Sequence, residues 1–68
     1  MSVLEIGQMI KARRKSVGIT QPHLAELAGI SINTLYKMER GEANPTLETI
    51  IKIAEVLGME LVLLIKKL

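Results

Sequence analysis

Four side chains that can form hydrogen bonds lie at helical spacing between residues 32 and 40. Their spacing is i, i+3, i+4 and i+7, and they are Asn33, Tyr36, Lys37 and Arg40. In a helix this spacing places them on one face, opposite Leu35 and Met38, which we expect to face a core. An α-helix fits the major groove of duplex DNA, where Asn can bond adenine through both amide atoms and Lys can donate to guanine. We therefore predict that Asn33 and Lys37 read base edges.

A solvated helix face is the ordinary alternative for such a polar stripe, and composition alone would favour it. The surrounding elements bear on this choice. Apolar residues at helical spacing predict helices over about residues 4–17, 21–28, 32–40 and 47–57, each followed by a glycine. Thr20, Ser31 and Thr46 can cap the last three helices, and Ile30 and Leu35 occupy the two positions of a hydrophobic staple.

The same periodicity predicts which side chains are buried. The expected buried stripes are Leu24, Leu27 and Ala28 in the second helix and Leu47, Ile50, Ile51, Ala54 and Leu57 in the fourth, and the first helix has apolar residues at helical spacing at Ile6, Met9, Ile10 and Val17. These stripes predict an all-α fold in which four helices share one aliphatic core.

The segment between the second and third helices has the features of a helix-turn-helix. Two short helices at a steep angle require a small residue, a glycine able to adopt positive φ and an apolar anchor, and Ala25, Gly29 and Leu35 supply them in order. This segment, with Glu39-Arg40-Gly41 and Asn44-Pro45-Thr46-Leu47, resembles the Cro and phage-repressor (XRE) type of helix-turn-helix DNA-binding domain. The resemblance covers about residues 4–58 and implies a compact four-helix, lambda-repressor-like domain over residues 1–58.

The resemblance also implies contacts with double-stranded DNA. Arg40 resembles the family's phosphate contact after the recognition helix, and Gln21 matches a DNA-contacting position at the start of the second helix, where free amides favour phosphate. Ile32 corresponds to a position that often contacts a base and could pack on a thymine methyl, or it could be a further staple residue. Tyr36 could reach a phosphate or cover a dimer flank. The expected DNA-binding residues are therefore Gln21, Ile32, Asn33, Tyr36, Lys37 and Arg40.

Arg14 and Glu39 match a pair that, in the family, links the first helix to the third as a largely buried ion pair. We therefore expect both residues to be structural. Lys11, Arg13, Arg14 and Lys15 place four of the nine basic residues within five positions. Such a local cluster makes an anionic partner possible. Whether Arg13 packs along its stem or points outward to phosphate is left open by the sequence.

Residues 59–68 differ from the fifth helix that closes most members of the family. As a strand, this segment would carry Met59, Leu61, Leu63 and Ile65 on one face. We predict a strand, with a fifth helix as the alternative. A lone strand has unpaired backbone groups, so pairing with a second copy would produce a homodimer and imply a palindromic operator. The tail also resembles that of Hip-type antitoxins, which implies a toxin protein as an alternative partner.

Composition limits the other classes of function. The 68 residues are enough for one small domain, and 49% of them are hydrophobic. The chain has no cysteine, which fits a reducing compartment, and no long apolar run, so we expect a cytoplasmic protein without membrane contact. With a single histidine, His23, and no nucleotide-binding motif, we expect no catalytic residues, no metal site and no cofactor.

Overall fold

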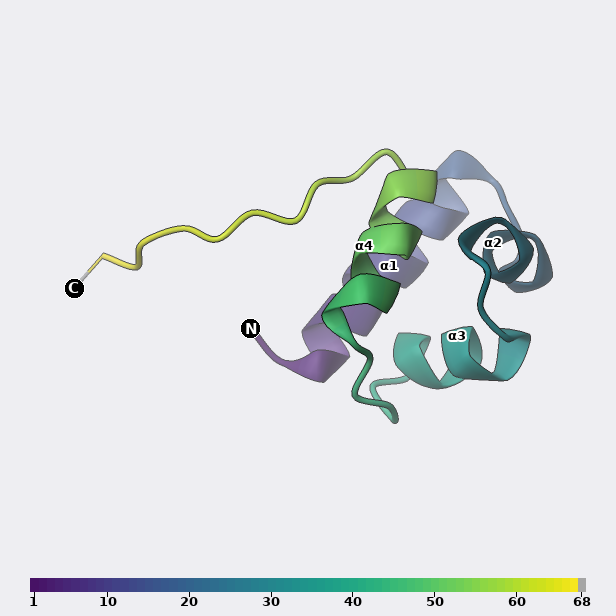
Figure 1. Ribbon diagram of the computed structural model, residues 1–68, viewed down its shortest axis with the longest axis horizontal. Coiled ribbons are helices and arrows are strands. Elements are labelled where there is room, and N and C mark those ends of the chain that lie inside the picture. Colours follow the sequence, from purple (N-terminus) through teal and green to yellow (C-terminus); the bar gives the residue numbers. More distant parts are fainter. Residues whose placement is uncertain (68) are drawn as a thin grey trace.

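Four helices form the compact part of the described residues. The computed structural model describes residues 1–67. Its helices are α1 (Val3–Val17), α2 (Gln21–Ala28), α3 (Ile32–Glu39) and α4 (Leu47–Val56). Helix α1 packs against α3, and α2 packs against both α3 and α4 (Figure 1). The predicted all-α, four-helix fold is therefore confirmed, with helix bounds within one residue of those expected from the sequence.

Each helix begins at a hydroxyl side chain that accepts a backbone hydrogen bond. Thr20, Ser31 and Thr46 accept from the N–H three residues further on, at 3.0 to 3.2 Å, as predicted. Ser2 forms a capping box, because its Oγ accepts from the Glu5 N–H at 3.1 Å and the Glu5 carboxylate accepts from the Ser2 N–H at 3.2 Å. The apolar pattern did not reveal this cap, since that pattern starts two residues later.

The turn between α2 and α3 has the three features that the sequence predicts. Ala25 is buried, Gly29 adopts a φ of 69°, and Leu35 is fully buried as the anchor of α3. The Ile30 N–H donates to the Ala25 carbonyl at 3.0 Å and closes the last turn of α2. A side chain at position 29 would strain this backbone, since the left-handed region favours glycine. The turn therefore fixes the angle at which α3 leaves α2.

The core lies between all four helices and is aliphatic. Its buried members are Ile10, Leu24, Ala25, Ala28, Leu35, Met38, Ile53 and Leu57. The buried stripe predicted for α4 was partly wrong, because Leu47 and Ile51 are exposed while Ile53, outside that stripe, is fully buried. Helix α4 is apolar around most of its circumference, so periodicity alone did not identify its inner face. Leu27, predicted to be buried in α2, is also exposed, and so are Met9 and Val17 of α1.

Helices α1 and α3 approach each other most closely at Gly7. Gly7 is buried, and a Cβ atom added to it would collide with the Met38 carbonyl oxygen and lie 3.0 Å from the Met38 carbonyl carbon. Both of these atoms belong to the backbone, so neither can move away as a flexible side chain would. Gly7 therefore sets the distance between α1 and α3.

Residues 59–67 leave the domain as a tail with neither helix nor strand in the described chain. The tail runs away from the helices (Figure 1), and Leu63, Leu64 and Ile65 are almost fully exposed. The predicted strand is therefore not confirmed, and the alternative fifth helix is also not found. A strand is defined by hydrogen bonds to a neighbouring strand, and the part of this single chain that the structure describes provides none. Leu68, the last residue of the predicted strand, lies outside the described residues.

The contact at Gly7 leads to a stability prediction. Gly7→Ala should lower the free energy of unfolding by about 1 to 3 kcal/mol through overpacking, although Ala normally stabilises a helix interior by up to about 1 kcal/mol relative to Gly. Urea unfolding followed by circular dichroism measures the change. Gln8→Ala, at the exposed neighbouring position, should be nearly neutral. A Gly7→Ala protein as stable as the unchanged protein would contradict the close contact.

Candidate nucleic-acid interface

Helix α3 buries one face and exposes a polar one. Leu35 and Met38 have exposed fractions of 0% and 1%. The opposite face is solvent-exposed and consists of Asn33, Tyr36, Lys37 and Arg40, as the spacing predicts. Ile32, in the first turn, is about half exposed, so its apolar surface is accessible. The structure thus brings five of the six residues expected to contact DNA onto a single helix and its C-cap.

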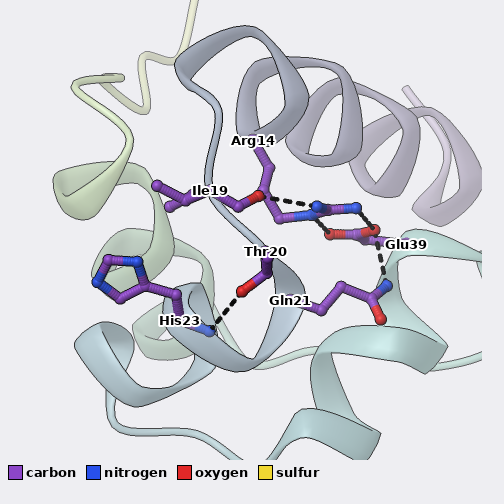
Figure 2. Close-up of polar contacts among 6 residues, drawn as sticks. All are labelled: Arg14, Ile19, Thr20, Gln21, His23 and Glu39. Carbon is purple, nitrogen blue, oxygen red and sulfur yellow. Dashed lines mark hydrogen bonds and ion pairs between the residues drawn. The ribbon is translucent and has the colours of Figure 1, made fainter.

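Arg14 of α1 and Glu39 at the end of α3 form a buried ion pair with two hydrogen bonds (Figure 2). Arg14 Nε lies 2.7 Å from Glu39 Oε2, and Arg14 Nη2 donates to Glu39 Oε1 at 3.0 Å. Arg14 and Glu39 are only 8% and 5% exposed. The hydrogen bonds to Glu39 raise the pKa of Arg14, whereas burial acts in the opposite direction. The ion pair connects the last turn of α1 to the last residue of α3.

Two further hydrogen bonds extend this ion pair to the start of α2. Arg14 Nη1 donates to the Ile19 carbonyl at 3.0 Å, and Gln21 Nε2 donates to Glu39 Oε1 at 2.9 Å (Figure 2). Among the described residues, no buried side-chain nitrogen or oxygen lacks a partner. Buried charge is tolerated when its hydrogen-bonding capacity is used in this way. The network therefore fixes α1, the start of α2 and the end of α3 relative to one another.

Gln21 has a contact that the sequence pattern did not reveal. It was expected to contact phosphate, and the structure places it half-buried with its amide nitrogen on Glu39. A Gln amide carries two N–H donors and a carbonyl acceptor, so the bond to Glu39 uses only one of its donors. A phosphate contact through the other N–H is compatible with this geometry, and the same side chain would then join the DNA backbone to the buried ion pair.

Arg40 is paired on the surface with two neighbours. Its Nε donates to Glu42 Oε1 at 2.8 Å, and its guanidinium carbon lies 5.3 Å from the centre of the Tyr36 ring. The Glu42 carboxylate raises the pKa of Arg40 through this hydrogen bond and through its charge. The sequence pattern did not single out Glu42, because its contact with Arg40 depends on the fold of the turn at Gly41.

Two of the four basic side chains at the end of α1 form hydrogen bonds within the protein. Arg14 is in the buried ion pair, and Arg13 Nε donates to the Leu57 carbonyl at 2.8 Å, which closes the C-terminal end of α4. Lys11 and Lys15 remain exposed. The cluster is therefore half structural, and this weakens the prediction that it forms an anion-binding patch. For Arg13, which the sequence left open, the structure shows a hydrogen bond from an exposed residue to the end of α4.

The residues expected to form a dimer lie along the tail with very different exposure. Met59 is half-buried against the core, Leu61 is about half exposed, and Leu63 and Ile65 are almost fully exposed. The start of the tail borders an apolar groove of about 230 Å³. Its lining includes Ile6, Met9, Ile50, Ala54, Met59 and Leu61. Apolar side chains on α1, α4 and the tail therefore form a continuous surface away from α3.

Within residues 1–67, no group of three or more His, Cys, Asp or Glu side chains is placed to hold a metal ion. His23 is exposed on α2. None of the described helices has the length and apolar character needed to cross a membrane.

The α2–α3 pair and its exposed polar face define a helix-turn-helix protein. The Helix-turn-helix family model matches residues 10–64, which is most of the chain. The chain therefore belongs to the helix-turn-helix family of the Cro and phage-repressor (XRE) type.

Several proteins are similar to this chain in sequence or in fold. A putative HTH-type transcriptional regulatory protein of Methanocaldococcus jannaschii is 41% identical over 56 residues, which cover 82% of this chain and 18% of that protein. The immunity repressor protein of Bacillus phage phi105 is 42% identical over 57 residues, 84% of this chain and 40% of the repressor. The crystal structure of the restriction-modification controller protein C.AhdI from Aeromonas hydrophila superposes with a TM-score of 0.82 at 33% identity, covering 85% of this chain and 88% of the controller. The chain thus spans less than half the length of the first two proteins and nearly all of the third.

The buried ion pair predicts energetic coupling between α1 and α3. Arg14→Met and Glu39→Gln should each destabilise the fold by about 3 to 5 kcal/mol, since each leaves a buried charge without its partner. The double variant removes both charges, so a double-mutant cycle in urea should return a coupling energy above about 1 kcal/mol. The exposed pair Lys52–Glu48, at 3.3 Å, is the control and should couple by under about 0.5 kcal/mol. Additive losses at Arg14 and Glu39 would contradict the structural role of the pair.

Proposed function

We propose that this protein is a sequence-specific, double-stranded DNA-binding transcriptional regulator that acts as a repressor and reads the major groove with α3. The observation that carries the proposal is the division of α3 into a fully buried face and an exposed face of hydrogen-bond donors. The buried network of Arg14 and Glu39 fixes the direction of that exposed face. Similarity to a phage immunity repressor supports the regulatory role.

The exposed residues have distinct roles in this proposal. Asn33 and Lys37 read adenine and guanine edges, and Ile32 packs on a thymine methyl. Arg40, Tyr36 and Gln21 contact phosphates, which position the protein without carrying sequence information. This division follows from chemistry, since Asn33 offers a donor and an acceptor while Arg40 lies at the end of the helix, where the DNA backbone passes.

A homodimer is the second part of the proposal. One recognition helix covers only a few base pairs, so two copies present α3 at half-sites about 34 Å apart on a palindromic operator. The exposed apolar tail supports this arrangement. We propose that Met59, Leu61, Leu63 and Ile65 form one face of a strand that pairs antiparallel with the same segment of a second copy. Pairing would satisfy the backbone groups of the tail and cover the apolar groove beside it.

The same tail supports a second candidate function, that of an antitoxin. In this case the exposed apolar residues Leu63 and Ile65 would contact a toxin protein instead of, or in addition to, a second copy. Large exposed apolar patches mark protein interaction sites in general, so exposure alone fits both uses. A monomeric isolated protein would favour the toxin contact, because only the dimer requires no other component.

The roles assigned on α3 lead to a DNA-binding prediction. Once a preferred duplex has been selected from a randomised pool, Asn33→Ala should lose about 1 to 3 kcal/mol of discrimination at one base pair. Arg40→Ala should weaken binding to selected and random duplexes by similar factors and reduce the salt slope by up to about 1. Fluorescence anisotropy over a range of NaCl concentrations measures both effects. Equal losses on both duplexes for Asn33→Ala would show that Asn33 is not a base reader.

The two faces of the tail provide a matched test of the dimer. Leu63→Lys places a charge on the face proposed to pair, whereas Leu64→Lys places it on the opposite face, and both side chains are exposed in the single chain. Leu63→Lys should shift the protein from dimer to monomer in sedimentation velocity at micromolar concentration. Affinity for a duplex with two half-sites should then fall towards that for one half-site, because the effective concentration supplied by the partner is lost.

The control variant Leu64→Lys should remain a dimer and keep full-site affinity. An unchanged protein that sediments as a monomer, or two variants that behave alike, would rule out the strand-paired dimer. A monomeric unchanged protein would favour the antitoxin function for the tail.

A further inference from the structure

The end of α3 holds a carboxylate in a fixed position beside the proposed phosphate contact. Helix α3 ends in a Schellman motif, in which the Gly41 N–H donates to the Met38 carbonyl at 3.1 Å and the Glu42 N–H donates to the Lys37 carbonyl at 2.9 Å. Gly41 adopts a φ of 73°, which turns the chain back along the helix. The backbone of Glu42 is therefore fixed against the last turn of the recognition helix.

This turn brings an anionic and a cationic side chain together at the surface. Glu42 Oε1 lies 2.8 Å from Arg40 Nε, and the Arg40 and Glu42 side chains are 55% and 50% exposed. The guanidinium carbon also lies over the Tyr36 ring, 5.3 Å from its centre. Arg40 thus contacts an aromatic ring and a carboxylate, and it already has an anionic partner before any DNA is present.

We infer that Glu42 is a positioning residue that competes with the DNA phosphate for Arg40 and thereby lowers the affinity for duplex DNA. This inference rests on the proposed function of α3. A phosphate that binds the Nε edge of the Arg40 guanidinium must displace the Glu42 carboxylate, because both accept from the Nε–H. The displaced carboxylate then remains close to the phosphate, because its backbone is fixed, and like charges repel at this distance. Glu42 therefore sets the strength of the contact and leaves base preference unchanged.

The competition also has a signature in the salt dependence of binding. A free Arg that neutralises one phosphate adds about 0.9 to the slope of log affinity against log salt. An Arg that must first give up an internal carboxylate adds less to this slope. The freed carboxylate attracts salt cations, and this uptake offsets part of the cation release from the DNA. Removing the Glu42 charge should therefore strengthen binding and steepen the salt dependence together. A purely structural role of Glu42 would not steepen the salt slope.

The test uses Glu42→Gln in the intact chain, which keeps the size of the side chain and removes its charge. The probe is a fluorescein-labelled duplex of arbitrary sequence, roughly 20 base pairs long, titrated between about 50 and 200 mM NaCl. Glu42→Gln should bind about three to ten times more tightly at the lowest salt, and its slope should be steeper by up to about 0.9 per protomer. Glu48→Gln removes a carboxylate from another exposed ion pair, that with Lys52, and should change neither quantity appreciably.

A double-mutant cycle shows whether Glu42 acts through Arg40. In an Arg40→Gln background, Glu42→Gln should change the affinity for the duplex little, because the guanidinium for which phosphate and carboxylate compete is absent. An equal gain in both backgrounds, an equal gain for Glu48→Gln, or an unchanged slope for Glu42→Gln would overturn the inference while the DNA-binding function stands. If the unchanged protein fails to bind the duplex even at the lowest salt, the proposed function itself fails and the inference falls with it.

Discussion

The buried Arg14–Glu39 ion pair is the interaction on which the orientation of the recognition helix depends. A buried ion pair contributes little net stability relative to well-packed apolar side chains, since desolvation offsets most of the attraction. Its effect here is on geometry. Two hydrogen bonds between planar groups allow one relative orientation of α1 and α3, and the bonds to Ile19 and Gln21 extend this constraint to α2. Apolar side chains of similar volume would leave more freedom at the same interface.

The backbone contacts around the ion pair act in the same direction. Gly7 lets α1 approach the Met38 carbonyl, which brings the Arg14 side chain within reach of Glu39 about two turns of α1 further on. At the C-terminal end of α3, the turn at Gly41 folds the chain back over the last helical carbonyls. The exposed face of α3 therefore belongs to a helix that is held on its inner side and at its C-terminal end. Its side chains can bind a ligand without reorganisation of the backbone.

The sequence predicted those parts of the structure that depend on local chemistry. Hydroxyl caps at Thr20, Ser31 and Thr46 act within a few residues, so both the helix starts and the turn could be derived. The inner face of α4 could not be derived, because apolar residues surround it and the choice of Ile53 over Ile51 is made by neighbouring helices. The conformation of the tail could not be derived for a similar reason, since a strand requires a partner.

The contacts of individual charged side chains were the least predictable, and they explain how stability and binding are separated in this molecule. Arg13 and Arg14 belong to a basic cluster in the sequence, yet both have internal partners, and only the partner of Arg14 was expected, from the family resemblance. Lys37 and Arg40 lie on the surface. Added salt screens exposed charges far more than buried ones. A rise in ionic strength would therefore weaken contacts between α3 and an anionic ligand while the internal ion pair, and with it the orientation of α3, persists. The recognition surface is thus kept intact when the ligand is released.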